Sequence, residues 1–205
     1  MERVAVFADV QNLYYTVKEQ HNSHFDYGAF LREATAGRQL VKALAYATDK
    51  GDERQRRFQQ ILKGLGFDVR LQPFVQRADG STKGDWDVGI AVDMLDLAPR
   101  VETVVLASGD GDYAPVVGKM VDELGIVVEV YGAQDLTAGL LARRATRFVP
   151  IQGLRPDRPM GSSTWSLGTR QNSIRGTVPP IEPVFARCSR RDRRVGNAKI
   201  PAVGP

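Results

Sequence analysis

The chain has 205 residues, of which 42% are apolar and 25% are charged, so its composition is that of a soluble globular protein and not of a fibrous or disordered one. Its single cysteine, Cys188, excludes an intramolecular disulfide and a zinc site built from several cysteines. Because the first residues form neither a membrane-length apolar run nor a secretory signal, we expect a cytoplasmic protein without membrane contact.

The net charge of +4 hides a difference between two parts of the chain. Residues 154–205 carry ten Arg and Lys against three Asp and Glu, a balance of +7 that leaves residues 1–153 at about −3. This segment is rich in Pro, Arg, Ser and Gly and has little apolar surface to bury. We therefore expect a folded domain over 1–153 and a disordered basic tail over 154–205. The charge of the tail fits either a solvated segment or an arm that binds a polyanion such as nucleic acid.

Apolar runs and helical patterns alternate along the predicted domain. In chain order they indicate a strand at 3–8, helical turns around 13–17, a helix at 25–35, a strand at 38–48, a helix at 51–67, a strand at 68–75, a helix at 87–98, a strand at 101–108, a helix at 112–125, a strand at 126–132, a helix at 137–145 and a sixth strand at 147–151. The strand runs are continuously apolar, which is typical of a parallel sheet covered by helices on both faces. Gly66 is expected to end its helix in a left-handed conformation, and Pro73 favours an edge strand.

Four aspartates are expected at one edge of this sheet. Asp9 ends the first strand, Asp110 and Asp112 follow the fourth in SGDGDY, and Asp87 begins a helix after the loop KGDWD. Ligands of open α/β sheets bind outside the carboxyl ends of the strands, so these segments are expected to converge there. Converging carboxylates raise one another's pKa unless a cation lies among them. An oxygen-only set without His or Cys selects Mg²⁺ or Mn²⁺, and such ions support phosphodiester cleavage.

Each acidic residue also has an ordinary interpretation. Asp87 or Asp112 alone fits a helix N-cap, and SGDGD alone fits a turn. In the metal interpretation, Asn12 positions a ligand through its amide, and Ser108 with the two glycines of SGDGD lets the backbone approach a phosphate. A small-molecule phosphatase is a weaker alternative, because Gln11 stands where a haloacid-dehalogenase-type site has its second aspartate.

Three segments, FADVQNLY, KGDWDVGIAVDML and VVLASGDGDYAPVV, resemble in this order and spacing the NYN domain family of PIN-like nucleases, and within it the bacterial LabA-like branch. The resemblance covers about residues 1–150. It implies a Rossmann-like, three-layer α/β/α domain with a mostly parallel sheet of five or six strands. It also implies an acidic, Mg²⁺- or Mn²⁺-dependent endoribonuclease that acts on RNA.

The resemblance assigns roles residue by residue. It implies that four aspartates bind the metal ion and act in catalysis: Asp9, Asp87, Asp110 and Asp112. Asn12 is expected to act in catalysis together with them. Asp93, in the AVDML segment, is expected to support this site, while Lys83 and Arg77 fit contacts to the RNA backbone and simple solvation equally well.

Two aromatic residues flank the aspartates. Trp86 fits stacking on RNA bases, and Tyr113 fits core packing. The alternative to an enzyme is a non-catalytic RNA- or protein-binding regulatory module of the same fold, and protein partners or self-association stay open.

Overall fold

The computed structural model of the chain describes residues 1–49, 51–73, 75–76, 82–83 and 86–151. These residues belong to the first of the two units into which the chain divides, Met1–Trp165. The predicted basic tail over 154–205 and Arg77 lie outside the described residues, so the expectations about them stay predictions.

The six strands of the main sheet and the helices between them follow the order expected from the sequence. The elements are β1 (Arg3–Asp9), α1 (Val10–His21), α2 (Tyr27–Ala34), β2 (Gln39–Asp49), α3 (Glu53–Gly64), β3 (Asp68–Pro73), β4 (Val75–Gln76), β5 (Thr82–Lys83), α4 (Asp87–Leu97), the short 3-10 helix η1 (Ala98–Arg100), β6 (Thr103–Ala107), a second short 3-10 helix η2 (Gly111–Tyr113), α5 (Ala114–Asp122), β7 (Val127–Gly132), α6 (Gly139–Arg144) and β8 (Arg147–Pro150). The short strands β4 and β5 lie where a strand end and a loop were expected. None of the described helices is long and apolar enough to cross a membrane.

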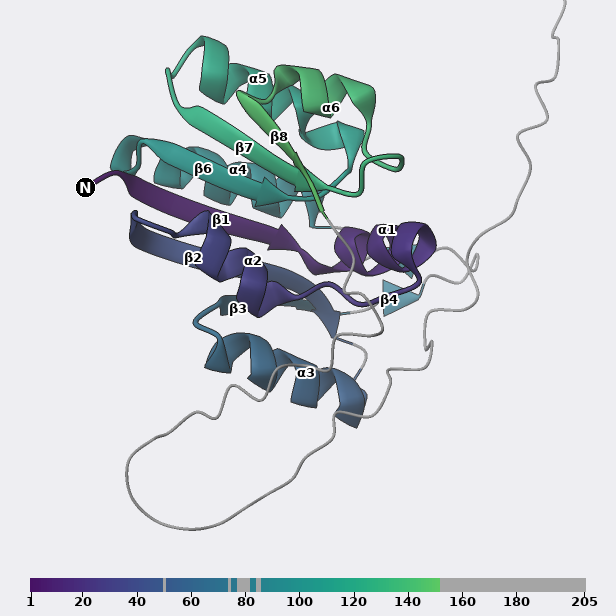
Figure 1. Ribbon diagram of the computed structural model, residues 1–205. Helices are drawn as coiled ribbons and strands as arrows, with labels where there is room; N and C mark the ends of the chain where they lie inside the picture. The colour runs from purple at the N-terminus through teal and green to yellow at the C-terminus, as the bar shows by residue number, and fades with distance from the viewer. Residues whose placement is uncertain (50, 74, 77–81, 84–85, 152–205) are drawn as a thin grey trace, which may run out of the picture. The chain divides into compact units, whose positions relative to one another are not determined.

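A six-stranded sheet in the order β3-β2-β1-β6-β7-β8 forms the centre of the domain (Figure 1). All its neighbouring strands run parallel, which confirms the predicted parallel sheet. β3 is an outer strand, as Pro73 indicates. Gly66 follows α3 with a φ of 102°, as predicted for the end of that helix. The continuous apolar runs arise because residues on both faces of the strands are buried, as they are for six consecutive residues of β1.

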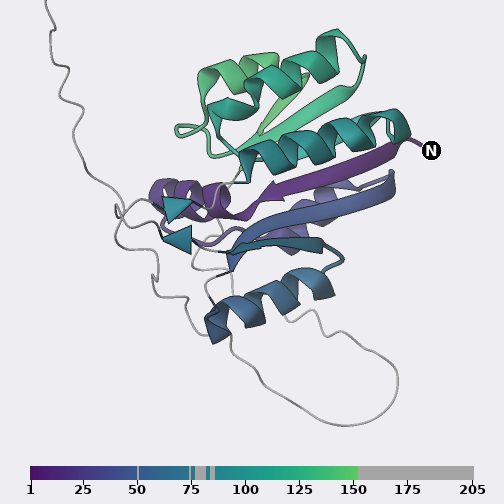
Figure 2. The same ribbon diagram turned by 180° about the vertical axis from the view of Figure 1, so that it is seen from behind.

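Helices cover both faces of the sheet. Side chains of α4, α5 and α6 pack with Phe7 and Leu106 on one face. Side chains of α1, α2 and α3 pack with Val6 and Ala8 on the other. Figures 1 and 2, which view the domain from opposite sides, show α1 and α2 in front of the sheet in one view and α4 in front of it in the other. The expected three-layer α/β/α arrangement is therefore confirmed.

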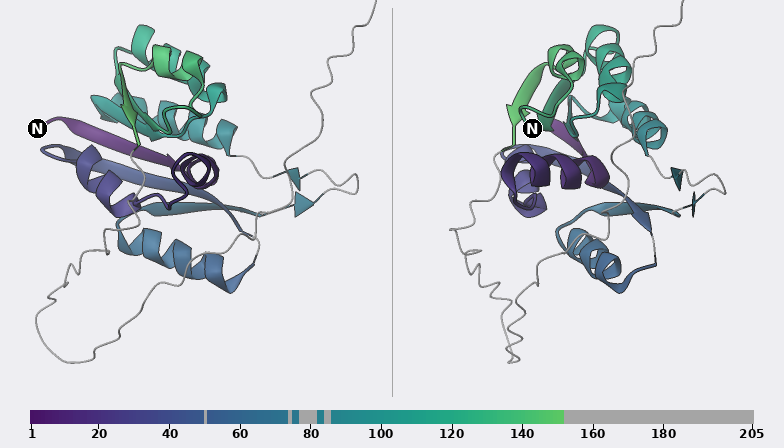
Figure 3. Two further views of the ribbon diagram at one scale, coloured as in Figure 1. Left: turned by 45° about the vertical axis from the view of Figure 1, so that its right-hand side comes forward. Right: turned by 90° about the vertical axis from the view of Figure 1, so that its right-hand side faces the viewer.

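The chain order of the strands reverses between β1 and β6. From β1 the chain adds β2 and then β3 on one side, and β6, β7 and β8 follow on the other. Ligands of parallel α/β sheets bind at such a switch point, outside the carboxyl ends of the strands. Figure 3 shows α1 and the small antiparallel β4–β5 pair at that end of the sheet. The fold thus directs attention to the residues that follow β1 and β6.

Candidate functional site

Asp9 lies at the switch point and belongs to two elements at once. It is the last residue of β1 and also the N-cap of α1, where its Oδ1 accepts a hydrogen bond of 3.1 Å from the backbone N–H of Asn12. Side chains alternate along a strand, so Asp9 points to the same face as Phe7, which is the face covered by α4. Only 7% of Asp9 is exposed. A carboxylate is therefore held inside the domain at the end of its central strand.

Asp87 reaches Asp9 through a buried tyrosine. The hydroxyl of Tyr113 donates to Oδ2 of Asp9 at 3.2 Å and to Oδ1 of Asp87 at 3.0 Å. Asp87 is the first residue of α4, and Tyr113 is the last residue of η2 and fully buried. The predicted convergence of these two aspartates is thus present in the structure, with a tyrosine hydroxyl between them.

The loop after β6 is tied to Asp9 by two further contacts. Ser108 is fully buried, and its Oγ lies 3.3 Å from Oδ2 of Asp9 while accepting a 3.2 Å hydrogen bond from the backbone N–H of Asp110. Oδ1 of Asn12 accepts a hydrogen bond of 2.9 Å from the backbone N–H of Gly109. Ser108, predicted as a substrate contact, therefore lies behind the carboxylate and orients it. The amide of Asn12 joins α1 to the loop, and its predicted role in positioning a ligand stays a prediction.

Asp110 and Asp112 occupy the outer part of the site. Oδ1 of Asp110 caps η2 by accepting a hydrogen bond of 3.0 Å from the backbone N–H of Asp112, whose own side chain is exposed. Within the described part of the chain, no three His, Cys, Asp or Glu side chains form a group that could hold a metal ion. The four predicted ligands are thus present as a pair, the buried Asp9 and the half-buried Asp87, with Asp110 and Asp112 in the loop beside it.

Helix capping was expected of Asp87 or Asp112, but two other aspartates of the site are the caps. Asp9 and Asp110 cap helices, whereas α4 begins after Trp86 without a side-chain capping bond. Asp112 lies inside the first turn of η2. Asp9 is both the last residue of β1 and the cap of α1, whereas Asp110 lies three residues after the end of β6 and directly before η2.

The glycines of SGDGD have another role than the one predicted. A Cβ at Gly109 would lie 3.1 Å from Oγ1 of Thr137, and a Cβ at Gly111 would lie 3.0 Å from Cβ of Ala138. The backbone N–H of Ala138 also donates to the carbonyl of Gly109 at 2.9 Å. The absence of a Cβ at these glycines therefore lets the segment between β7 and α6 pack closely against the loop. The idea that they leave space for a phosphate is wrong on this side of the loop.

The electrostatics of the pair fit a cation. Burial raises the pKa of Asp9 to about 6, the negative charge of Asp87 acts in the same direction, and the hydrogen bonds from Asn12, Tyr113 and Ser108 only partly oppose them. None of the ion pairs between described side chains involves Asp9. The donor atoms at the site are carboxylate, amide and hydroxyl oxygens, which is the donor chemistry that Mg²⁺ and Mn²⁺ prefer.

Tyr113 remains a hydrogen-bond donor in this environment. Burial, followed by the charges of Asp9 and Asp87, raises its pKa above the usual value for tyrosine. The expectation that Tyr113 packs in the core is confirmed. Its function as a bridge between two carboxylates was not predicted from the sequence. A buried tyrosine hydroxyl generally needs a polar partner, so the neighbouring aspartates could have been considered as its partners.

Asp93 and Trp86 fix α4 to the strand β2. The hydroxyl of Tyr46 donates to Oδ2 of Asp93 at 2.7 Å, and Nε1 of Trp86 donates to the carbonyl of Ala47 at 3.0 Å. The rings of Tyr46 and Trp86 also meet edge to face, with centroids 5.3 Å apart. Asp93 therefore lies apart from the Asp9–Asp87 pair, and its contact with Tyr46 anchors the middle of α4 to β2. Its predicted supporting role stays a prediction. Lys83 belongs to β5, whose backbone pairs with β4.

The fold and the site together define a class of protein: a parallel α/β domain with an acidic pair, one member of which is buried, at the point where its strand order reverses. The NYN domain family matches residues 3–152, and the chain belongs to this family.

Two relatives support this assignment. The chain is 26% identical over 162 residues to the low amplitude and bright protein LabA of Synechococcus elongatus, covering 75% of this chain and 86% of that protein. It is also similar to the crystal structure of VPA0982, a protein of unknown function from Vibrio parahaemolyticus, with 46% identity and a TM-score of 0.70. That match covers 74% of this chain and 93% of the other.

Proposed function

We propose that this NYN domain protein is a metal-dependent endoribonuclease that cleaves phosphodiester bonds of RNA. The observation that carries the proposal is the pair Asp9 and Asp87, joined by one hydroxyl at the switch point of the sheet. A buried carboxylate whose pKa is raised to about 6 is unfavourable as an anion unless positive charge is brought to it. Membership in the NYN family and the resemblance to PIN-like nucleases suggest that this charge is a divalent cation used on RNA.

Each residue of the site has a task in this proposal. Asp9 and Asp87 hold Mg²⁺ or Mn²⁺, and Asp110 and the exposed Asp112 complete the acidic set. When bound, such an ion supplies the positive charge that activates a water and stabilises the leaving oxygen of the phosphodiester. Asn12 fixes the loop after β6, and its backbone N–H holds Oδ1 of Asp9. The chain's own contribution is thus to keep the carboxylates oriented before the cation arrives.

RNA is the proposed substrate, and cationic side chains outside the acidic pair are the proposed contacts. Lys83 lies in β5, which is part of the β4–β5 pair at the carboxyl end of the sheet (Figure 3). Arg77 and the arginines of residues 154–205 add positive charge in sequence. Contacts of this kind are made to phosphates, so RNA binding is expected to weaken steeply as salt is raised. A cytoplasmic location is part of this proposal.

The test is cleavage of labelled RNA by the full chain with Mn²⁺ or Mg²⁺, in parallel with the variants Asp110→Asn and Asp96→Asn. Asp96 is an exposed aspartate near the far end of α4, so Asp96→Asn makes the same chemical change outside the site. We expect Asp110→Asn to lose about 100-fold or more of the activity, since even residues behind a metal ligand contribute 10- to 100-fold. Cleavage that persists in EDTA, or in Asp110→Asn at the wild-type rate, contradicts the proposal.

One observation favours a second candidate, a non-catalytic module that binds RNA or a protein. The described side chains form an acidic pair and no larger group that could hold a metal ion. Under this alternative the chain binds RNA in a filter or anisotropy assay, yet leaves it intact after prolonged incubation with Mn²⁺. Cleavage that requires Asp110 excludes this candidate.

A further inference from the structure

We infer that Tyr113 is the positioning residue of the acidic site: its hydroxyl bridges Asp9 and Asp87 and sets the separation at which they receive a cation. The inference rests on the metal site of the proposed function. It concerns a residue that holds the ligands and that does not itself touch the metal or the RNA.

The position of Tyr113 in the chain makes it suited to this role. It lies in η2, directly after the acidic loop that follows β6, while its hydroxyl contacts the end of β1 and the start of α4. One side chain thus joins the three segments that carry the predicted ligands. The two carboxylate oxygens can be no farther apart than the sum of their distances to the hydroxyl, 3.2 and 3.0 Å. A rigid aromatic side chain in a packed core therefore limits how far apart the two oxygens can lie.

The hydroxyl weakens the repulsion between the two carboxylates. A tyrosine hydroxyl has one hydrogen to donate, and here two carboxylate oxygens accept from it. Without this hydrogen, two negative groups would face each other across a site in which Asp9 is only 7% exposed. Moving the carboxylates apart would relieve the repulsion, and a cation would then have to draw them together again. The bridge keeps this cost from arising.

The remainder of α4 is held by other contacts, so the bridge can be removed alone. Tyr46 of β2 donates to Asp93 of α4, and Trp86, the N-cap of α4, donates to the carbonyl of Ala47 in β2. Tyr113→Phe keeps the ring in the core and deletes only the hydroxyl. Tyr46→Phe is a matched control, since Tyr46 is equally buried and its hydroxyl also binds an aspartate of α4.

The experiment measures Mn²⁺ binding to the full chain by electron paramagnetic resonance, without RNA. We expect Tyr113→Phe to bind Mn²⁺ about 10- to 100-fold more weakly than the wild type, the usual cost of removing a partner that orients a metal ligand. Tyr46→Phe is expected to stay within about twofold, because its hydroxyl has no contact with Asp9 or Asp87. In an Asp87→Ala background, Tyr113→Phe is expected to have little further effect, because the pair is already broken.

A second measurement needs no metal. In EDTA, Tyr113→Phe is expected to raise the unfolding equilibrium constant about tenfold or more, since it deletes a hydrogen bond to charged groups, and less in the Asp87→Ala background. Wild-type Mn²⁺ affinity in Tyr113→Phe, equal losses in Tyr46→Phe, or equal unfolding effects in both backgrounds overturn the inference. If the wild type binds Mn²⁺ but cleaves no RNA, the proposed nuclease fails and the role of Tyr113 stands.

Discussion

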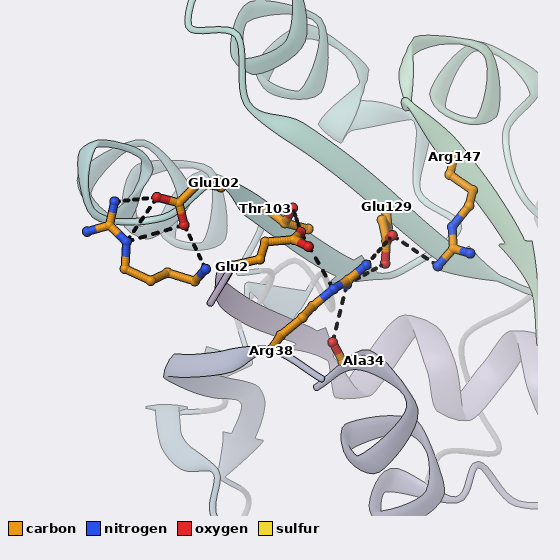
Figure 4. Close-up of polar contacts among 8 residues, drawn as sticks. Glu2, Ala34, Arg38, Glu102, Thr103, Glu129 and Arg147 are labelled. Carbon is orange, nitrogen blue, oxygen red and sulfur yellow. Dashed lines mark hydrogen bonds and ion pairs between the residues drawn. The ribbon is translucent and has the colours of Figure 1, made fainter. Parts of the chain in front are cut away.

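Two buried carboxylates at opposite ends of the sheet differ in what surrounds them. Glu129, on β7, is 4% exposed, and its oxygens lie 2.9 Å from Arg38 and 3.0 Å from Arg147. Figure 4 shows this cluster, with Arg38 reaching from the start of β2 and Arg147 from the start of β8. Asp9 is similarly buried at the carboxyl end of β1, but its side-chain partners are the neutral hydroxyls of Tyr113 and Ser108.

The pKa values of the two groups diverge accordingly. Burial would raise the pKa of Glu129, but the hydrogen bonds and charge of Arg38, together with Arg147, lower it below its usual value. For Asp9 burial prevails, and its pKa rises to about 6. Two residues of similarly low exposure thus have pKa shifts in opposite directions. At the amino end of the strands the domain neutralises its buried acid with its own arginines. At the carboxyl end no ion pair between described side chains reaches Asp9, and a buried acid without such a partner costs stability.

The largest expected effect comes from removing one of the two arginines that neutralise Glu129. Arg38→Ala removes a bidentate partner of Glu129 and leaves a buried carboxylate with Arg147 alone. We expect a loss of about 3 kcal/mol in the free energy of unfolding, because removing one partner strands a buried charge. Urea denaturation of the metal-free protein measures this loss.

The control for this variant is Arg3→Ala. Arg3 and Glu102 form an ion pair in which the side chains are 45% and 51% exposed. An exposed pair contributes little, so the expected loss is below about 1 kcal/mol. Equal losses in Arg38→Ala and Arg3→Ala would show that burial of Glu129 does not matter.

The two ends were not equally predictable from the sequence. The pairing of Asp9 with Asp87 followed from continuous apolar runs, which indicate parallel strands whose carboxyl ends share an edge. The Glu129 cluster was missed, although an acid inside the apolar run IVVEVYG signals a buried charge that needs a partner. That signal does not identify Arg38, which lies 91 positions away in the chain, because such pairing depends on how the strands order in space.

The details inside the site were also beyond the sequence. Nothing local to SGDGDY shows that Gly109 and Gly111 face Thr137 and Ala138, or that the Tyr113 hydroxyl meets Asp9 and Asp87. Such contacts are set by how loops from different strands pack at the edge. The fold class and the ligand candidates were therefore accessible from periodicity and position, whereas the hydrogen bonds that orient the ligands required coordinates.

The next effect is an increase in the free energy of unfolding and concerns Asp9. Asp9→Asn keeps the size of the side chain and removes its buried charge. In EDTA we expect the free energy of unfolding to increase by about 1–3 kcal/mol, in line with a carboxyl pKa raised to about 6. RNA cleavage is expected to be lost in the same variant. Urea denaturation at neutral pH measures the stability. A lower stability of Asp9→Asn would mean that the hydrogen bonds of the carboxylate outweigh its unmatched charge.

The smallest expected effect is the pH dependence of the stability that the Glu129 ion pairs contribute. Because the pKa of Glu129 is lowered on folding, its ion pairs stabilise the protein above the usual glutamate range and lose that effect as the pH falls through the folded-state value. Relative to Glu129→Gln, wild-type stability is therefore expected to be higher at pH 7 by about 1 kcal/mol or more, and the difference should shrink towards pH 3. Denaturation series at several pH values measure it. A difference that stays constant over this range would mean that the Glu129 charge is not what Arg38 and Arg147 stabilise, and the contrast with Asp9 would then rest on packing instead of charge.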